Sequence, residues 1–117
     1  MAQLSTHVLD LSSGLPAANM RIELYRCAGP DRQLLTSVIT NSDGRTAAPL
    51  LAGATLPTGV FELVFHAAAY FRELAVALPD PPFLDQVVIR FGIADSGGRY
   101  HVPLLLSPFG YSTYRGS

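Results

Sequence analysis

The chain has 117 residues and a formal net charge of −1, and this length suits one ordinary domain that buries roughly two-thirds of the surface its unfolded chain exposes. Its basic and acidic residues are scattered, so the sequence has no cluster of positive charge that would bind nucleic acid or an anionic membrane. No apolar run approaches the roughly 18 residues of a membrane-spanning helix. We therefore expect a single domain over residues 1–117 that binds neither nucleic acid nor a membrane.

Apolar residues make up 49 % of the chain and charged residues only 15 %, which is little charge for a domain with a high ratio of surface to volume. Some apolar surface is therefore expected to be covered by other subunits, which favours an oligomer. The single Cys27 can form no internal disulfide, and the N-terminal residues lack the pattern of a secretion signal. Both features predict a cytoplasmic protein.

Short runs with alternating apolar and polar residues recur between turn-forming residues, a pattern typical of an all-β sandwich. In the first half of the chain these runs cover residues 4–10, 20–27 and 33–41. The Asp43-Gly44 pair that follows the third run favours a hairpin turn.

The second half of the chain continues this pattern and contains the one plausible helix. Further alternating runs cover residues 59–66, 86–93 and 99–115. The helix is predicted over residues 67–74, as one or two turns. The last run reads as two strands joined by a turn at residues 107–110, and Pro103 within it indicates an edge strand or a bulge. About seven or eight strands are expected, within the usual range for a sandwich of this size.

Histidines and one arginine are the residues best suited to proton transfer and ligand binding. An imidazole titrates near pH 6.5, so it can exchange protons at neutral pH. His7 and His101 lie on strand faces opposite their apolar neighbours, and for each a functional and a structural role are about equally favoured. His66 is better explained as a hydrogen-bonded structural residue. Arg45 is either a solvated turn residue or a guanidinium fork for the carbonyls of a planar ligand.

A metal site and a serine nucleophile are both poorly supported by the sequence. The three histidines are dozens of residues apart, and no cysteine or carboxylate pattern completes a zinc site, so neither a metal nor another cofactor is predicted. No G-x-S-x-G elbow occurs, and Ser5, Ser12 and Ser107 are interpreted as strand or turn residues.

Three stretches of the sequence together point to a known family: LSTHVLD near the start, SDGR in the middle and YHVPLLLSPFGYSTYRGS at the end. With these stretches, the chain resembles the 5-hydroxyisourate hydrolases of the transthyretin-like family over essentially its whole length. The hormone carriers of that family share the strand pattern but lack the terminal YRGS and the histidines. Arg99 departs from the family pattern, in which a histidine is more common before the tyrosine.

The resemblance implies a transthyretin-like β-sandwich of two four-stranded sheets with one short helix. It also implies a homotetramer around a central channel, with the active sites between dimers. The site residues that it implies are His7, Arg45 and His101 together with the terminal Tyr114, Arg115, Gly116 and Ser117.

The implied reaction is hydrolysis of a cyclic amide in 5-hydroxyisourate, the product of urate oxidation, to 2-oxo-4-hydroxy-4-carboxy-5-ureidoimidazoline. It needs a positioned water, a base, an acid and stabilisation of the tetrahedral oxyanion. One of His7 and His101 would activate water and the other would donate a proton or a hydrogen bond, and the sequence leaves the order open. Arg45 would hold the oxygen-rich edge of the substrate ring.

Roles for the terminal residues also follow from the resemblance. Arg115 would anchor the ligand or the terminus, and the carboxylate of Ser117 would bond to Arg115 or orient a histidine. Tyr114 is either catalytic or a packing residue. In an extended strand Arg115 faces away from Tyr114, so both can reach one ligand only if the chain bends at Gly116 or two subunits share the site.

The alternative function is a carrier of flat aromatic small molecules. A channel lined by histidines and arginines suits a polar heterocycle, whereas a carrier is expected to present apolar side chains to its ligand. The polarity of the site therefore separates the two functions.

Overall fold

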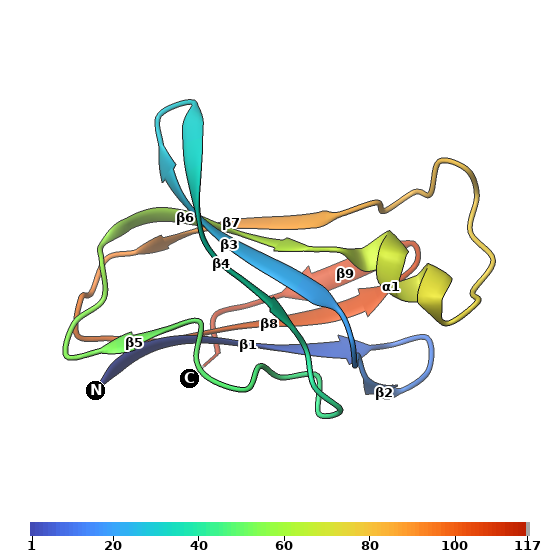
Figure 1. The fold of residues 1–117 in the computed structure, drawn as a ribbon, viewed down its shortest axis with the longest axis horizontal. Coiled ribbons are helices and arrows are strands. Elements are labelled where there is room, and N and C mark those ends of the chain that lie inside the picture. Colours follow the sequence, from blue (N-terminus) through green and yellow to red (C-terminus); the bar gives the residue numbers. More distant parts are fainter. Residues whose placement is uncertain (117) are drawn as a thin grey trace.

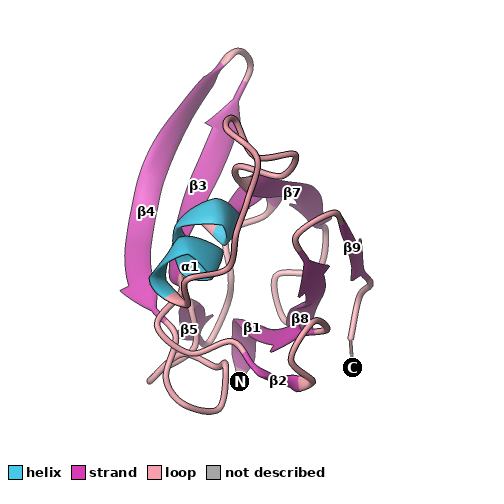
Figure 2. Ribbon diagram, turned by 90° about the vertical axis from the view of Figure 1, so that its right-hand side faces the viewer, coloured by secondary structure: helices cyan, strands magenta, loops and turns pink. Residues whose placement is uncertain are grey.

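The computed structural model describes residues 1–116, which form nine strands and one short helix arranged as two facing sheets (Figures 1 and 2). In chain order the elements are β1 (Ala2–Asp10), β2 (Leu15–Pro16), β3 (Arg21–Ala28), β4 (Asp31–Ile39), β5 (Leu51–Gly53), β6 (Gly59–Phe65), α1 (Ala67–Glu73), β7 (Val87–Ile93), β8 (Arg99–Ser107) and β9 (Gly110–Thr113).

Two sheets, one of five strands and one of four, make up the sandwich of the described residues. The four-stranded sheet has the order β4-β3-β6-β7, and the other has the order β2-β1-β8-β9 with β5 also paired to β1. The all-β sandwich with a short helix is thus confirmed. The additional strand arises because β2 and β5 are short segments that share one edge of β1, β5 near its start and β2 at its end.

The first strand and the eighth lie side by side in the middle of the five-stranded sheet and run parallel. Their register places Ser5 beside His101 and His7 beside Pro103. Parallel neighbours need a long connection, and here almost the whole chain lies between them. Residues close to the two ends of the sequence therefore meet on one sheet surface.

The core lies between the two sheets, where the inward faces of the strands meet. Side chains such as Leu4 and Leu104 from one sheet and Phe61 and Phe65 from the other are fully buried. Burial of one such side chain stabilises the fold by about 1.5–3 kcal/mol. Helix α1 contributes Phe71 to the same core. Within residues 1–116 no helix has the length and apolar character needed to cross a membrane.

The turn at Asp43 and Gly44 does not form the hairpin that the sequence predicts. It carries the chain from the end of β4 across to the other sheet, where Arg45 pairs with His7 at the edge of β1 in an isolated bridge. Gly44 has a φ of +71°, and a Cβ atom there would come within 2.4 Å of the Val8 carbonyl oxygen. Only glycine fits this crossing, and the crossing places Arg45.

Pro103 lies in β8, an interior strand, and the pairing on either side of it keeps one register, so it marks neither the edge strand nor the bulge that the sequence indicates. The pairing of β8 with β9 covers Leu104 to Ser107 and then stops at the proline. It resumes in the same register at the bridge between His101 and Gly116. Because proline has no N–H to donate, the ladder is interrupted where Pro103 stands.

Candidate active site

Both histidines predicted to act in the site lie on the outer surface of the five-stranded sheet. Along β1 the buried residues Thr6 and Val8 alternate with half-buried Ser5 and His7, and His101 is half-buried in β8. Because successive strand residues point to opposite faces, the outward position of His7 and His101 follows from the apolar neighbours that fill the core. The prediction that they face away from those neighbours is confirmed.

Arg45 extends this row of side chains beyond the edge of β1. It pairs with His7 in the backbone, and its positive charge acts on both His7 and His101. Across the sheet, Arg45 pairs with His7 on β1, and two positions before His7 the pairing runs from Ser5 to His101 on β8 and on to Gly116. We call the surface formed by Arg45, His7 and His101 the histidine face.

The ring of His101 is held from two sides. Ser5 Oγ lies 2.9 Å from His101 Nδ1, within hydrogen-bond distance. On the other side, the Gly116 N–H donates to the His101 carbonyl oxygen at 2.7 Å. A Cβ atom at Gly116 would lie 2.7 Å from His101 Cδ2, so the glycine lets the chain pass directly against the imidazole.

Burial and neighbouring positive charge favour the neutral form of both histidines. Burial is the main cause that lowers the pKa of His101 below its usual 6.5, followed by the charges of Arg45 and His7. Burial and then Arg45 lower the pKa of His7, and a hydrogen bond to the backbone of Asp43 and the Asp43 charge only partly oppose this. At pH 7 both rings are therefore mostly neutral.

A pocket of about 330 Å³ opens beside His101. The residues that line it are Gln3, Ser5, Arg45, Arg99, Tyr100 and His101. Its size suits a small molecule, and two guanidinium groups with no carboxylate among these lining residues suit a ligand rich in carbonyl oxygens or carrying negative charge. Among residues 1–116, no three His, Cys, Asp or Glu side chains gather closely enough to hold a metal ion.

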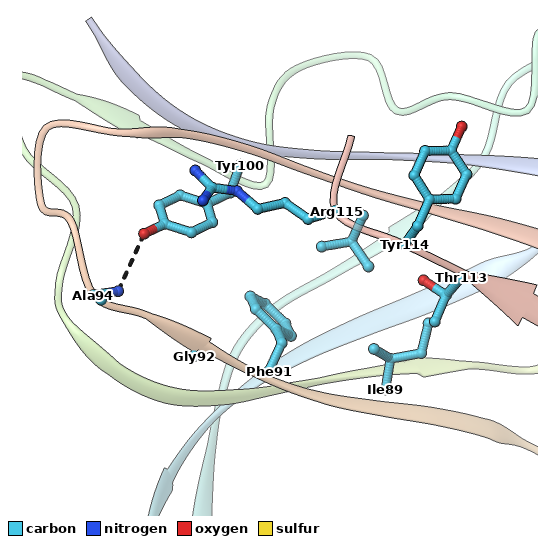
Figure 3. Close-up of a pocket in the computed structure, with 9 residues that line it drawn as sticks. Ile89, Phe91, Gly92, Ala94, Tyr100, Thr113, Tyr114 and Arg115 are labelled. Carbon is cyan, nitrogen blue, oxygen red and sulfur yellow. Dashed lines mark hydrogen bonds between the residues drawn. The ribbon is translucent and has the colours of Figure 1, made fainter. Parts of the chain in front are cut away.

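Arg115 lies on the opposite side of the sheet from His101. Its guanidinium stacks 4.2 Å above the centre of the Tyr100 ring, and the Tyr100 hydroxyl accepts a hydrogen bond from the Ala94 N–H at 3.1 Å (Figure 3). This places Arg115 at a largely apolar pocket of about 360 Å³ between β7 and the chain after β9. Within one subunit, Arg115 and His101 do not share a pocket.

Tyr114 and Ser117 complete the predicted residues. The Tyr114 ring points away from the Arg115 guanidinium and is 60 % exposed, yet both residues line the same apolar pocket (Figure 3). Ser117, which the resemblance places in the site, lies outside the described residues. The structure therefore brings Arg45 and Gly116 to His101 and sets His7 beside Arg45, outside the lining of the pocket at His101. It separates Arg115 from them.

Two residues at the site have no role in the prediction from sequence. Ser5, interpreted there as a strand or turn residue, contacts His101, and Arg99 lines the same pocket. Each precedes one of the histidines by two positions, which puts it on the same strand face. That spacing is the signal that identifies both residues.

A model of the HIUase/Transthyretin family matches residues 4–116 of the chain. The chain belongs to this family. Among curated relatives of the family, 5-hydroxyisourate hydrolase 2 of Rhizobium meliloti (strain 1021) is 60 % identical over 115 residues, which cover 98 % of this chain and 96 % of the relative.

Three solved structures share the fold. The structure of Klebsiella pneumoniae 5-hydroxyisourate hydrolase superposes with a TM-score of 0.82 at 35 % identity, covering 100 % of this chain and 94 % of that one. The structure of sea bream transthyretin in complex with thyroxine has a TM-score of 0.85 at 25 % identity, and the match covers 97 % of this chain and 94 % of that one. (S)-allantoin synthase gives 0.92 at 42 % identity over 99 % of this chain, which spans 44 % of the synthase chain.

Proposed function

We propose that the protein hydrolyses 5-hydroxyisourate to 2-oxo-4-hydroxy-4-carboxy-5-ureidoimidazoline, a step of urate and purine catabolism. The observation that carries the proposal is the histidine face, on which two imidazoles with lowered pKa values lie beside the Arg45 guanidinium. The names of the relatives that match over nearly the full chain support the same substrate.

The residues on the histidine face match the needs of this reaction. A water oxygen adds to the cyclic amide carbonyl while a neutral imidazole accepts one of its protons. The Arg45 guanidinium stabilises the negative charge that develops on the carbonyl oxygen. When the C–N bond breaks, the departing nitrogen takes a proton from the second imidazole. The first imidazole returns a proton to the second through solvent, and the new carboxylic acid loses its remaining proton to solvent. His7 and His101 supply the two imidazoles without a metal or other cofactor.

The terminal residues have distinct parts in this proposal. Gly116 positions the His101 ring through its close contact. Tyr114, Arg115 and Ser117 are proposed to bind substrate or to help catalysis in an assembly in which two subunits share a site, because Arg115 and His101 of one subunit face different pockets. A homotetramer satisfies this condition, and exposed aromatic residues such as Phe83 and Phe109 offer surface for subunit contacts. The single free Cys27 suits a cytoplasmic location.

A carrier of flat aromatic molecules is the second candidate function. The pocket between β7 and the chain after β9 favours it, because Ile89, Phe91 and Val102 give that pocket a largely apolar lining. The transthyretin in the sea bream structure binds thyroxine. The polar pocket at His101 favours the hydrolase.

The decisive experiment generates 5-hydroxyisourate in situ from urate with urate oxidase and follows its ultraviolet decay, with the spontaneous decay subtracted. We expect the protein to accelerate the decay. A chain ending at Thr113 is expected to lose this activity while it keeps its fold by circular dichroism. If neither protein accelerates the decay, the hydrolase proposal fails, and binding of a flat aromatic probe such as thyroxine then tests the carrier.

A further inference from the structure

Protein atoms contact both ring atoms of His101 that are bonded to Cγ, namely Nδ1 and Cδ2. Ser5 Oγ meets Nδ1 at 2.9 Å, and the Gly116 backbone packs against Cδ2. The ring nitrogen that remains for a ligand is Nε2. The chemistry of His101 therefore depends on whether Nε2 carries the ring proton, and the partner of Nδ1 decides this.

The hydroxyl of Ser5 can either donate to an unprotonated Nδ1 or accept from a protonated one. The charged side chains that line this pocket, Arg45 and Arg99, are donors only, so they offer the Ser5 hydrogen no acceptor. Donation to Nδ1 gives that hydrogen a partner within the protein and leaves the ring proton on Nε2.

We propose that Ser5 is a positioning residue that keeps the proton of neutral His101 on Nε2, which makes His101 the proton donor of the site and His7 the base. This assignment rests on the proposed hydrolysis for its catalytic meaning. The protonation pattern itself is a property of the free protein and can be measured without substrate.

His7 is the second imidazole of the histidine face, and Arg45 pairs with it at the edge of β1. A neutral imidazole has one unprotonated nitrogen, which can accept a proton from water. With His101 as the proton donor, this is the role that is left for His7. Within the described residues, Arg45 and Asp43 act on the His7 ring, and Arg45 and His7 act on the His101 ring. Arg99 lines the pocket at His101.

The two rings divide the steps of the reaction. The unprotonated nitrogen of His7 takes a proton from the attacking water, whose oxygen bonds to the amide carbon. Nε2 of His101 gives its proton to the departing nitrogen as the C–N bond breaks, which leaves His101 as an imidazolate in a pocket that Arg45 and Arg99 line. The protonated His7 returns one proton to His101 through solvent, and the new carboxylic acid loses its proton to solvent, so protons and charges balance over one turnover.

The first test is nitrogen-15 NMR of the histidine rings in the full-length protein, recorded above the usual histidine pKa of 6.5. The chain has three histidines, so a His66→Asn variant leaves two rings to assign. We expect His101 to show an unprotonated Nδ1 and a protonated Nε2. A protonated Nδ1 on His101 overturns the proposal. An enzymatically inactive wild-type chain would refute the proposed hydrolysis, but the ring signals would still decide the tautomer.

The second test compares Ser5→Ala with Ser5→Thr, which retains the hydroxyl, in the 5-hydroxyisourate decay assay. Ser5→Ala removes one neutral hydrogen bond to His101, the proton donor, and is expected to lower kcat about fivefold to tenfold. Ser5→Thr should recover most of the lost kcat. Ser37→Ala is the matched control, because it removes a hydroxyl that accepts a hydrogen bond from Arg21 on the other sheet, and it should retain wild-type kcat. Unchanged kcat in Ser5→Ala, or an equal loss in Ser5→Thr, overturns the positioning role.

Discussion

The outer surfaces of the two sheets use the same residue types in opposite ways. On the four-stranded sheet, His66 bonds to Glu23 at 2.6 Å, and Glu62 accepts from both Arg32 and Arg90. On the histidine face of the other sheet, no ion pair involves His7, Arg45 or His101 within residues 1–116. Paired charges stabilise a surface, whereas imidazoles and a guanidinium without carboxylate partners remain available for a ligand.

Replacing one histidine on each of the two surfaces should give the largest difference in kcat between two variants. We expect His101→Asn to lower the catalysed decay of 5-hydroxyisourate about 100-fold or more, because it removes the proton donor. His66→Asn removes a structural partner of Glu23 and should leave the rate within about twofold of wild type. The measurement is kcat for both variants, with circular dichroism to confirm that each is folded. Equal losses in the two variants would abolish the distinction between the surfaces.

A single methyl group added beside the His101 ring should also lower kcat. In Gly116→Ala the new Cβ would stand 2.7 Å from His101 Cδ2, so the ring or the chain must move. We expect kcat to fall about tenfold, since a small displacement of a catalytic group is costly. Gly97→Ala is the matched control, because its Cβ would meet its nearest neighbour at an ordinary 3.5 Å. Full activity of Gly116→Ala would show that the close contact is not needed.

The pH dependence of stability and activity should follow the protonation of His7 and His101. The pKa values of His7 and His101 are lowered in the folded protein, so the unfolded chain binds protons more readily below pH 6.5. The free energy of unfolding should thus decrease as the pH falls below that value and should be insensitive to these two groups above it. Activity should decline over the same acidic range. Urea unfolding and initial rates measured across pH 5 to 8 test this, and an activity loss centred above pH 6.5 would contradict it.

The smallest effect is expected on the outer surface of the four-stranded sheet, where the charges form ion pairs. Glu62→Gln removes the charge that holds two arginines, whose side chains are 45 % and 54 % exposed. Exposed ion pairs contribute little, so the free energy of unfolding should drop by at most about 1 kcal/mol, less at high salt. Thermal unfolding at two salt concentrations measures this loss. The rate of hydrolysis should stay unchanged, and a marked decrease would connect the two surfaces.

The alternation of side chains made much of the fold and the orientation of the histidines predictable. Residues 4–10 and 99–115 have a period of two, and this alone sets His7 and His101 opposite their apolar neighbours. The helix after β6 was equally evident from its composition. The two short strands β2 and β5 escaped prediction because two or three residues show no periodicity.

Pairing between distant strands was not predictable from local patterns. The parallel register of β1 and β8 places Ser5 against His101, yet a period of two says nothing about which strands are neighbours. The Asp43-Gly44 turn has the composition of a hairpin, but its geometry is used to change sheets because Gly44 fits against the Val8 carbonyl. Pro103 likewise indicates an edge strand or a bulge by its residue type, although it stands in an interior strand where the hydrogen-bond ladder to β9 breaks.

The parallel pairing of β1 with β8 also has a consequence for folding kinetics. The contact between Ser5 and His101 joins residues 96 positions apart, so its loop must close before the site exists. Contacts at such sequence separation slow folding and form late relative to local hairpins such as β3 and β4. During synthesis the β3–β4 hairpin can form early, while the histidine face appears only after β8 has been made. Recovery of activity after dilution from denaturant is thus expected to report the completion of folding.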